Sequence, residues 1–181
     1  MTERDEAVAA AAELVRRLSA PSVPGGIAGR LRALVDELPP VASRFTDEER
    51  AAFDRGAGDI DARGTHPFRG TASPVAAAVR PIEGGMVVRF DVRHEGVPGH
   101  AHGSFVAGFF DVALGLVAIQ AGGVGLTTQL DVRYLRPTPL DVDVAYVGEV
   151  VETGARTLVR GTARVGDEDL ATAELRFLHR R

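Results

Sequence analysis

The residues best suited to chemistry lie in one stretch, GHAHGSFVAGFFDVALGLVAIQAG, which runs from Gly99 to Gly122. Asp111 is the only ionisable residue between Gly103 and Ala121. A carboxylate in apolar surroundings costs several kcal/mol unless it is paired or takes up a proton. Such a group is therefore expected to have either a structural partner or a role in acid–base chemistry. Position alone leaves both interpretations of Asp111 open.

The segment from Gly103 to Ala121 is predicted to be a helix that is buried on nearly every side. Large apolar side chains recur at helical spacing on more than one face, so no polar stripe remains for solvent. On a helical wheel Asp111 falls among small residues, which are Ser104, Ala107, Gly108, Gly115 and Ala118. The single charge is thus expected on the face that another body can approach closely. The stretch is too short and too interrupted for a membrane span.

The composition is that of a soluble globular protein. The chain has 181 residues, of which 45% are hydrophobic, and a net charge of −4, so one domain with a helical extension is expected. It has no Cys, which excludes disulfides and thiolate chemistry, and no Lys, which excludes Schiff-base catalysis. The negative charge argues against nucleic acid as a partner. The acidic start is no targeting signal, so we expect a cytoplasmic protein that does not bind membranes.

Residues 1–60 are predicted to form a helical N-terminal extension, and residues 61–181 the main domain. Capping and stop signals predict three helices, which begin near Thr2, Ala28 and Thr46 and end near Leu18, Leu38 and Arg55. We expect the extension to pack over the main domain or a partner subunit. The loop from Gly56 to Pro74 contains HPFRGTASP and is expected to be ordered, because it has side chains to bury, namely His66, Phe68 and Arg69.

Alternating apolar residues predict strands on both sides of the central helix. The expected ranges are Val75–Arg80, Met86–Arg93, Leu126–Tyr134, Val142–Val151, Ala155–Val165 and Leu170–His179. In the strand that follows the helix, Thr128 and Leu130 are expected on one face and Thr127 and Gln129 on the other. Short turns favour an antiparallel meander. The predicted fold is α+β, with a curved sheet wrapped around the long helix.

Three motifs in this order resemble the hotdog-fold acyl-CoA thioesterases, and most closely their PaaI-like branch. His102-Gly103-Ser104 with Asp111 resembles the family's His-Gly-Gly segment and its catalytic Asp, nine residues after the His. Before it, Glu95-Gly96-Val97-Pro98-Gly99 resembles the family's Glu-Gly-Pro-Pro-Gly lead-in. After it, Thr127 and the run from Tyr134 to Leu140 resemble the next strand and its Tyr-x-Arg-Pro-x-Pro-Leu ending. The resemblance, to which HPFRGTASP also contributes, covers about residues 64–179.

The resemblance implies an enzyme that hydrolyses a fatty or aromatic acyl-CoA to the free acid and CoA, without a cofactor. Asp111 would act as general base or as nucleophile, and both roles stay open. The helix N-terminal amides of Gly103 and Ser104 would stabilise the oxyanion. Thr127 would orient Asp111 or the attacking water. The candidate substrate contacts are His102, Ser104, Thr128 and Arg136, of which Arg136 could meet a CoA phosphate.

The spacing of the two principal residues predicts a shared site. Gly103 and Asp111 are eight residues apart, which is about 12 Å along one helix, so they cannot both reach one carbonyl. The amide of one subunit must then meet the Asp111 of another across antiparallel helices. We expect a homodimer or a dimer of dimers with the active site at the subunit interface.

Other interpretations carry less weight. His100 and His102, with His94 and Asp111, could form a metal cluster, but the pattern is unspecific and no metal is expected. Ser104 is not in the strained strand–turn–helix of a nucleophile elbow. A hotdog-type hydratase would show an Asp–His motif that is not found. A non-catalytic acyl-CoA-binding module remains the alternative, because Ser104 stands where the family motif has its second Gly.

Overall fold

The computed structural model describes residues 3–38, 47–48, 51, 66–68, 73 and 75–179. Two helices come first, α1 (Glu3–Leu18) and α2 (Ile27–Asp36), as the sequence predicts. The remaining elements are β1 (Ala78–Ile82), β2 (Gly85–Arg89), the 3-10 helix η1 (Val92–His94), β3 (Glu95–Val97), β4 (His100–Ala101), α4 (Gly103–Gly122), β5 (Gly125–Tyr134), β6 (Asp143–Glu152), β7 (Arg156–Val165) and β8 (Glu168–His179). The predicted third helix lies mostly outside the described residues, as does the predicted boundary at residue 60.

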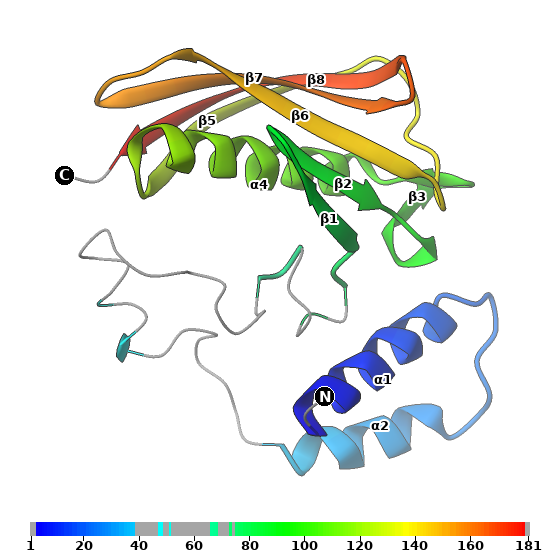
Figure 1. Ribbon diagram of the computed structural model, residues 1–181. Coiled ribbons are helices and arrows are strands. Elements are labelled where there is room, and N and C mark those ends of the chain that lie inside the picture. Colours follow the sequence, from blue (N-terminus) through cyan, green and yellow to red (C-terminus); the bar gives the residue numbers. More distant parts are fainter. Residues whose placement is uncertain are drawn as a thin grey trace.

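Six antiparallel strands form one curved sheet in the order β1-β2-β6-β7-β8-β5, with α4 lying against its inner face (Figure 1). This arrangement confirms the α+β prediction of a sheet around a central helix. The meander prediction holds for β6, β7 and β8 but is wrong for β5. The β5 strand pairs with β8, and residues 135–142 cross to β6 on the far side of β7. Pro137 and Pro139 lie in this crossing, where they cannot continue a strand ladder.

The central helix is held against the sheet by a glycine notch. Gly148 of β6 and Gly161 of β7 are register partners, and both face Leu114 of α4. A Cβ atom at Gly148 would lie 2.6 Å from Leu114 Cδ2, and one at Gly161 would clash with the same methyl group. The Leu114 side chain is therefore fully buried where the two strands lack side chains. Missing side chains on paired strands thus allow close approach of the helix.

The remaining core comes from both sides of this contact. Phe109 and Phe110 of α4 pack on Tyr146, and Phe109 also packs on Phe90. By length and composition alone, α4 could cross a membrane. Because most of its large side chains are buried against the sheet, it is instead the core helix of this domain.

The predicted strand over Met86–Arg93 is too long. The β2 strand ends at Arg89, and η1 follows, because Asp91 caps a new helical turn. Its carboxylate accepts the backbone N–H of Arg93 at 2.9 Å, and the Asp91 N–H donates to His94 Nδ1 at 3.0 Å. This capping box overrides the alternation of apolar residues. The α1 helix contacts the domain at η1.

Candidate active site

The N-terminus of α4 is capped by the His102 side chain. His102 has an extended backbone, with φ −65° and ψ 137°, and its Nδ1 accepts the amide of Ser104 at 3.1 Å. The Ser104 hydroxyl lies 2.7 Å from the same nitrogen. The amides of Phe105 and Val106 donate to the His102 carbonyl. Nδ1 thus acts as an acceptor, which assigns the ring proton to Nε2 in the neutral imidazole.

Gly103 supplies the amide that is left for a ligand. Among the residues that the structure describes, none accepts a hydrogen bond from the Gly103 N–H, whereas the Ser104 N–H is taken by His102. The sequence predicts both amides as an oxyanion site. In this geometry the backbone of Gly103 alone offers a donor at the positive end of the α4 dipole.

Tyr134, at the end of β5, fixes this first turn from the other side. Its hydroxyl donates to the Gly103 carbonyl at 2.8 Å, and its ring lies 3.4 Å from where a Cβ of Gly103 would stand. Tyr134 belongs to a sequence motif, but no role was expected for its side chain. The contact joins residues 31 positions apart, which spacing along the chain does not reveal.

Asp111 lies two turns further along α4 and is exposed. On its helix face Ser104 is exposed and Gly108 is half-buried, whereas Gly115 and Ala118, further along the helix, are buried. The prediction that Asp111 is buried in apolar surroundings is therefore wrong for the single chain. The reason is that small residues on one side of α4 leave its carboxylate uncovered by any residue that the structure describes. Close approach of another body to this face stays a prediction.

A bulge in β5 changes the faces predicted for that strand. Thr127 pairs with Phe177 and Gln129 with Arg176, so Thr128 is the extra residue and the alternation slips by one position. Thr127 consequently shares the inner face with Phe177, and the Thr128 hydroxyl donates to the Arg176 carbonyl at 3.1 Å. From Tyr134 beside Gly103, seven residues of strand place Thr127 roughly 23 Å along the sheet. Asp111 is about 12 Å along the helix, so Thr127 and Asp111 of one chain are too far apart for the predicted role of Thr127, which would need the Asp111 of a second chain.

Arg136 is engaged at the turn between β7 and β8. Its Nε lies 2.7 Å from the Glu168 carboxylate, and its guanidinium donates to the Asp169 carbonyl at 2.9 Å. The group is half-exposed, so it remains accessible to a phosphate. Its role in binding CoA stays a prediction.

The histidines near the helix each have other contacts. His94 is fully buried, and its Nε2 lies 3.1 Å from the Val75 carbonyl while Nδ1 accepts the Asp91 amide. Burial lowers the pKa of His94, although the nearby Asp91 carboxylate opposes this. His100 Nδ1 lies 2.9 Å from the Pro98 carbonyl. Within the described part of the chain, no three His, Asp or Glu side chains form a group that could hold a metal.

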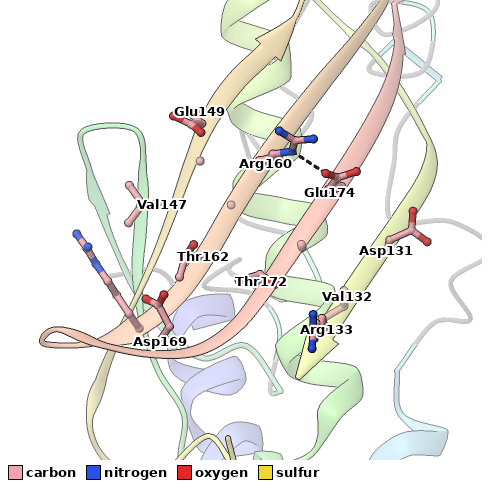
Figure 2. A pocket seen from close by; sticks show the side chains of 14 residues that line it. Asp131, Val132, Arg133, Val147, Glu149, Arg160, Thr162, Asp169, Thr172 and Glu174 are labelled. Carbon is pink, nitrogen blue, oxygen red and sulfur yellow. Dashed lines mark hydrogen bonds and ion pairs between the residues drawn. The ribbon is translucent and has the colours of Figure 1, made fainter. Parts of the chain in front are cut away.

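A groove of about 780 Å³ lies elsewhere, on the outer face of the sheet (Figure 2). Its side chains alternate with residues that face α4 and carry both signs of charge, from Asp131, Arg133, Glu149, Arg160, Arg164, Asp169 and Glu174. Arg160 and Glu174 pair across it at 2.6 Å. None of the predicted site residues lines this groove, and it is separated from Asp111 by the sheet.

The fold is the hotdog fold, in which a curved antiparallel sheet encloses one long helix. Within it, residues 98–177 match the thioesterase superfamily. The chain is similar to a solved structure described as a thioesterase superfamily protein, with a TM-score of 0.76 and 25% identity over 98% of this chain and 91% of that one.

Two further structures share the fold. A protein from Streptococcus mutans, bound to acetyl-CoA, has a TM-score of 0.51 and 22% identity over 56% of this chain and 86% of that one. A protein from Bacillus halodurans, solved with CoA, has a TM-score of 0.56 and 14% identity over 84% of this chain and 99% of that one. At these identities, the likeness shows the fold alone.

Proposed function

We propose that this protein hydrolyses acyl-CoA thioesters. The observation that carries the proposal is the free Gly103 amide at the N-terminus of α4, held by His102 on one side and Tyr134 on the other. A thioester carbonyl bound there would have its developing negative charge stabilised by a fixed donor. Asp111 would activate water as a general base or attack the carbonyl carbon itself, and both routes stay open.

The site requires two subunits. Because Gly103 and Asp111 of one chain are about 12 Å apart along the same helix, one thioester cannot reach both. A two-fold axis between antiparallel α4 helices would bring the Asp111 of each subunit to the Gly103 of the other. The same contact would cover the exposed carboxylate and exclude bulk water from it. We propose a homodimer, or a dimer of dimers, on this basis.

The β5 strand provides the edge for this dimer. It ends the sheet, spans ten residues and contains no proline. At the other edge β1 has five residues and includes Pro81, which lacks an N–H for pairing. Leu126 and Tyr134, at the two ends of β5, are more than half exposed. Pairing of β5 with its copy would extend the sheet and set the two helices side by side.

The proposed substrate is a CoA thioester in the cytoplasm. CoA and acetyl-CoA occupy other proteins of this fold, which makes them the first ligands to test. A PaaI-like assignment rests on the Glu95–Gly99 and Tyr134–Leu140 motifs.

The experiment is thiol release from a panel of acyl-CoA substrates by wild type, Asp111→Asn and Gly103→Pro. Proline at the first helical position keeps the helix while removing the amide hydrogen, and the extended His102 suits a following proline. We expect each variant to lose about a hundredfold or more in kcat. Activity retained in Asp111→Asn would contradict the proposal, and CoA binding without turnover in wild type would favour the acyl-CoA-binding module.

A further inference from the structure

Phe68 packs on α4 beside the helix face that carries Asp111. Its ring packs edge-on against Phe105 and Phe109 of α4, with centroids 6.3 Å and 5.5 Å away. It lies so close to Gly108 that a Cβ there would stand 2.5 Å from Phe68 Cε1 and clash with Cζ. Gly108 is therefore the residue that allows this ring to reach the helix.

The segment that carries Phe68 is tied down by its own hydrogen bonds. The Ala77 amide donates to the Phe68 carbonyl at 3.1 Å, and the Phe68 amide donates to His66 Nδ1 at 3.2 Å. The Ser73 hydroxyl donates to the Pro67 carbonyl at 2.8 Å. These contacts hold the ring in place, and Phe68 is half-buried against the core, as expected. Most of the predicted loop Gly56–Pro74, Arg69 included, lies outside the described residues.

The two directions along α4 from Asp111 differ. Gly108 precedes Asp111 by three residues and lies beside it on the helix surface. The Phe68 ring lies over Gly108 and occupies the space that a substrate would otherwise fill there. Gly115 follows Asp111 by four residues and is buried, but among the described residues no heavy atom lies within 4 Å of where its Cβ would stand. A substrate whose carbonyl sits at Asp111 thus meets an aromatic wall on the Gly108 side, and no described side chain takes the corresponding place at Gly115.

We infer that Phe68 limits the length of the acyl group. This inference rests on the proposed function and deepens it. The wall formed by Phe68 and Phe105 is apolar and suits the acyl group rather than the amide-bearing pantetheine arm. The site is then selective for short acyl groups, and the specificity-determining contact is the Phe68 ring over Gly108.

The test compares butanoyl-, octanoyl- and palmitoyl-CoA as substrates of wild type, Phe68→Ala, Phe68→Leu and the control Val75→Ala. Val75 lies in the same segment, and its side chain is partly exposed. We expect the palmitoyl-to-butanoyl ratio of kcat/KM to rise about tenfold or more in Phe68→Ala and less in Phe68→Leu, with no change in the control. An unchanged ratio in a folded variant that turns over substrate would overturn the inference and leave the proposed function intact.

Two further measurements do not depend on turnover. We expect Phe68→Ala to bind a non-hydrolysable palmitoyl-CoA thioether about tenfold more tightly than wild type; equal affinity would contradict the inference even if no thioester is hydrolysed. Gly108→Ala should be better tolerated in the Phe68→Ala background than in wild type, because the clash is gone and Ala favours the helix. Equal Tm changes in the two backgrounds would show that the ring does not lie over Gly108.

Discussion

Tyr146 carries a fully buried hydroxyl in the core between β6 and α4. The Tyr146 oxygen is the buried side-chain polar atom without a hydrogen-bond partner among the residues that the structure describes. Burial raises the pKa of this phenol, so it stays neutral. An unsatisfied buried hydroxyl costs about 1–3 kcal/mol, and deleting it leaves the ring packing on Phe109 and Phe110 intact.

We therefore expect Tyr146→Phe to be neutral or to stabilise the protein by about 1 kcal/mol. The measurement is the free energy of unfolding in urea, with activity followed in parallel. A loss of about 2 kcal/mol would mean that the hydroxyl has a partner in the assembled protein.

His94 makes stability depend on pH. Its imidazole is buried between Phe90 and Phe105, and its pKa in the folded state lies below the ordinary value of 6.5. Below the unfolded-state pKa the unfolded chain binds the proton that the folded chain refuses, so stability falls as pH drops through 6.5. We expect wild type to lose more unfolding free energy than His94→Gln between pH 7.5 and pH 5.5. Parallel pH profiles of the two proteins would contradict this assignment.

At the scale of elements, the glycine notch under Leu114 sets how closely α4 approaches the sheet. A methyl group at Gly161 would collide with Leu114 and come 2.8 Å from the Val147 carbonyl. The Val147 backbone and the fully buried Leu114 side chain have little room to move away from the added methyl group. We expect Gly161→Ala to lower the free energy of unfolding by about 1–3 kcal/mol. The cost of Gly161→Ala should be smaller in a chain that also carries Leu114→Ala, because part of the clash is relieved. The comparison is the double-mutant coupling measured by chemical denaturation.

Most helices and strands could be predicted from the sequence, because their apolar residues recur at clear helical or strand spacing. The helix from Gly103 and the strands from Leu126, Val142, Ala155 and Leu170 lie within a few residues of the observed ranges. The predictions that were wrong concern positions where local hydrogen bonds, or pairing between strands distant in the sequence, determine the structure. The Asp91–His94 capping box ended β2 early, and the Thr128 bulge depends on the pairing of β5 with β8. The two short strands β3 and β4 were not predicted.

At the scale of the whole molecule, exposure of Asp111 is the main difference from expectation. The small residues on the Asp111 face were expected to allow close approach of another body, and this stays a prediction. Burial was inferred from apolar neighbours on the helix, yet those neighbours belong to the other faces of α4. In the proposed dimer the partner subunit would cover Asp111, and a single sequence does not encode such a contact explicitly. The residue types of the candidate site could therefore be predicted from the sequence, but the exposure of Asp111 could not.

A mixing experiment tests whether subunits share the site. Asp111→Asn retains the Gly103 amide, and Gly103→Pro retains the Asp111 carboxylate. If each site takes one group from each subunit, a heterodimer of the two inactive variants has one intact site and one doubly defective site. Equal mixing makes half of the dimers mixed, so we expect about a quarter of wild-type activity to return. Activity that stays absent after demonstrated subunit exchange would rule out the shared site.

The position of β8 in the sheet has a consequence for synthesis on the ribosome. The β5 strand pairs within the chain with β8, and β8 comes later in the sequence than every element it supports. His179, near the end of β8, also contacts the end of α4, because its Nδ1 lies 3.0 Å from the Gly123 carbonyl. Until residues 168–179 emerge, β5 has no neighbour and the apolar face of α4 remains partly uncovered. Between the synthesis of α4 and that of β8, the nascent chain therefore exposes apolar surface that invites chaperone binding or aggregation, and the sheet is completed only when β8 is made.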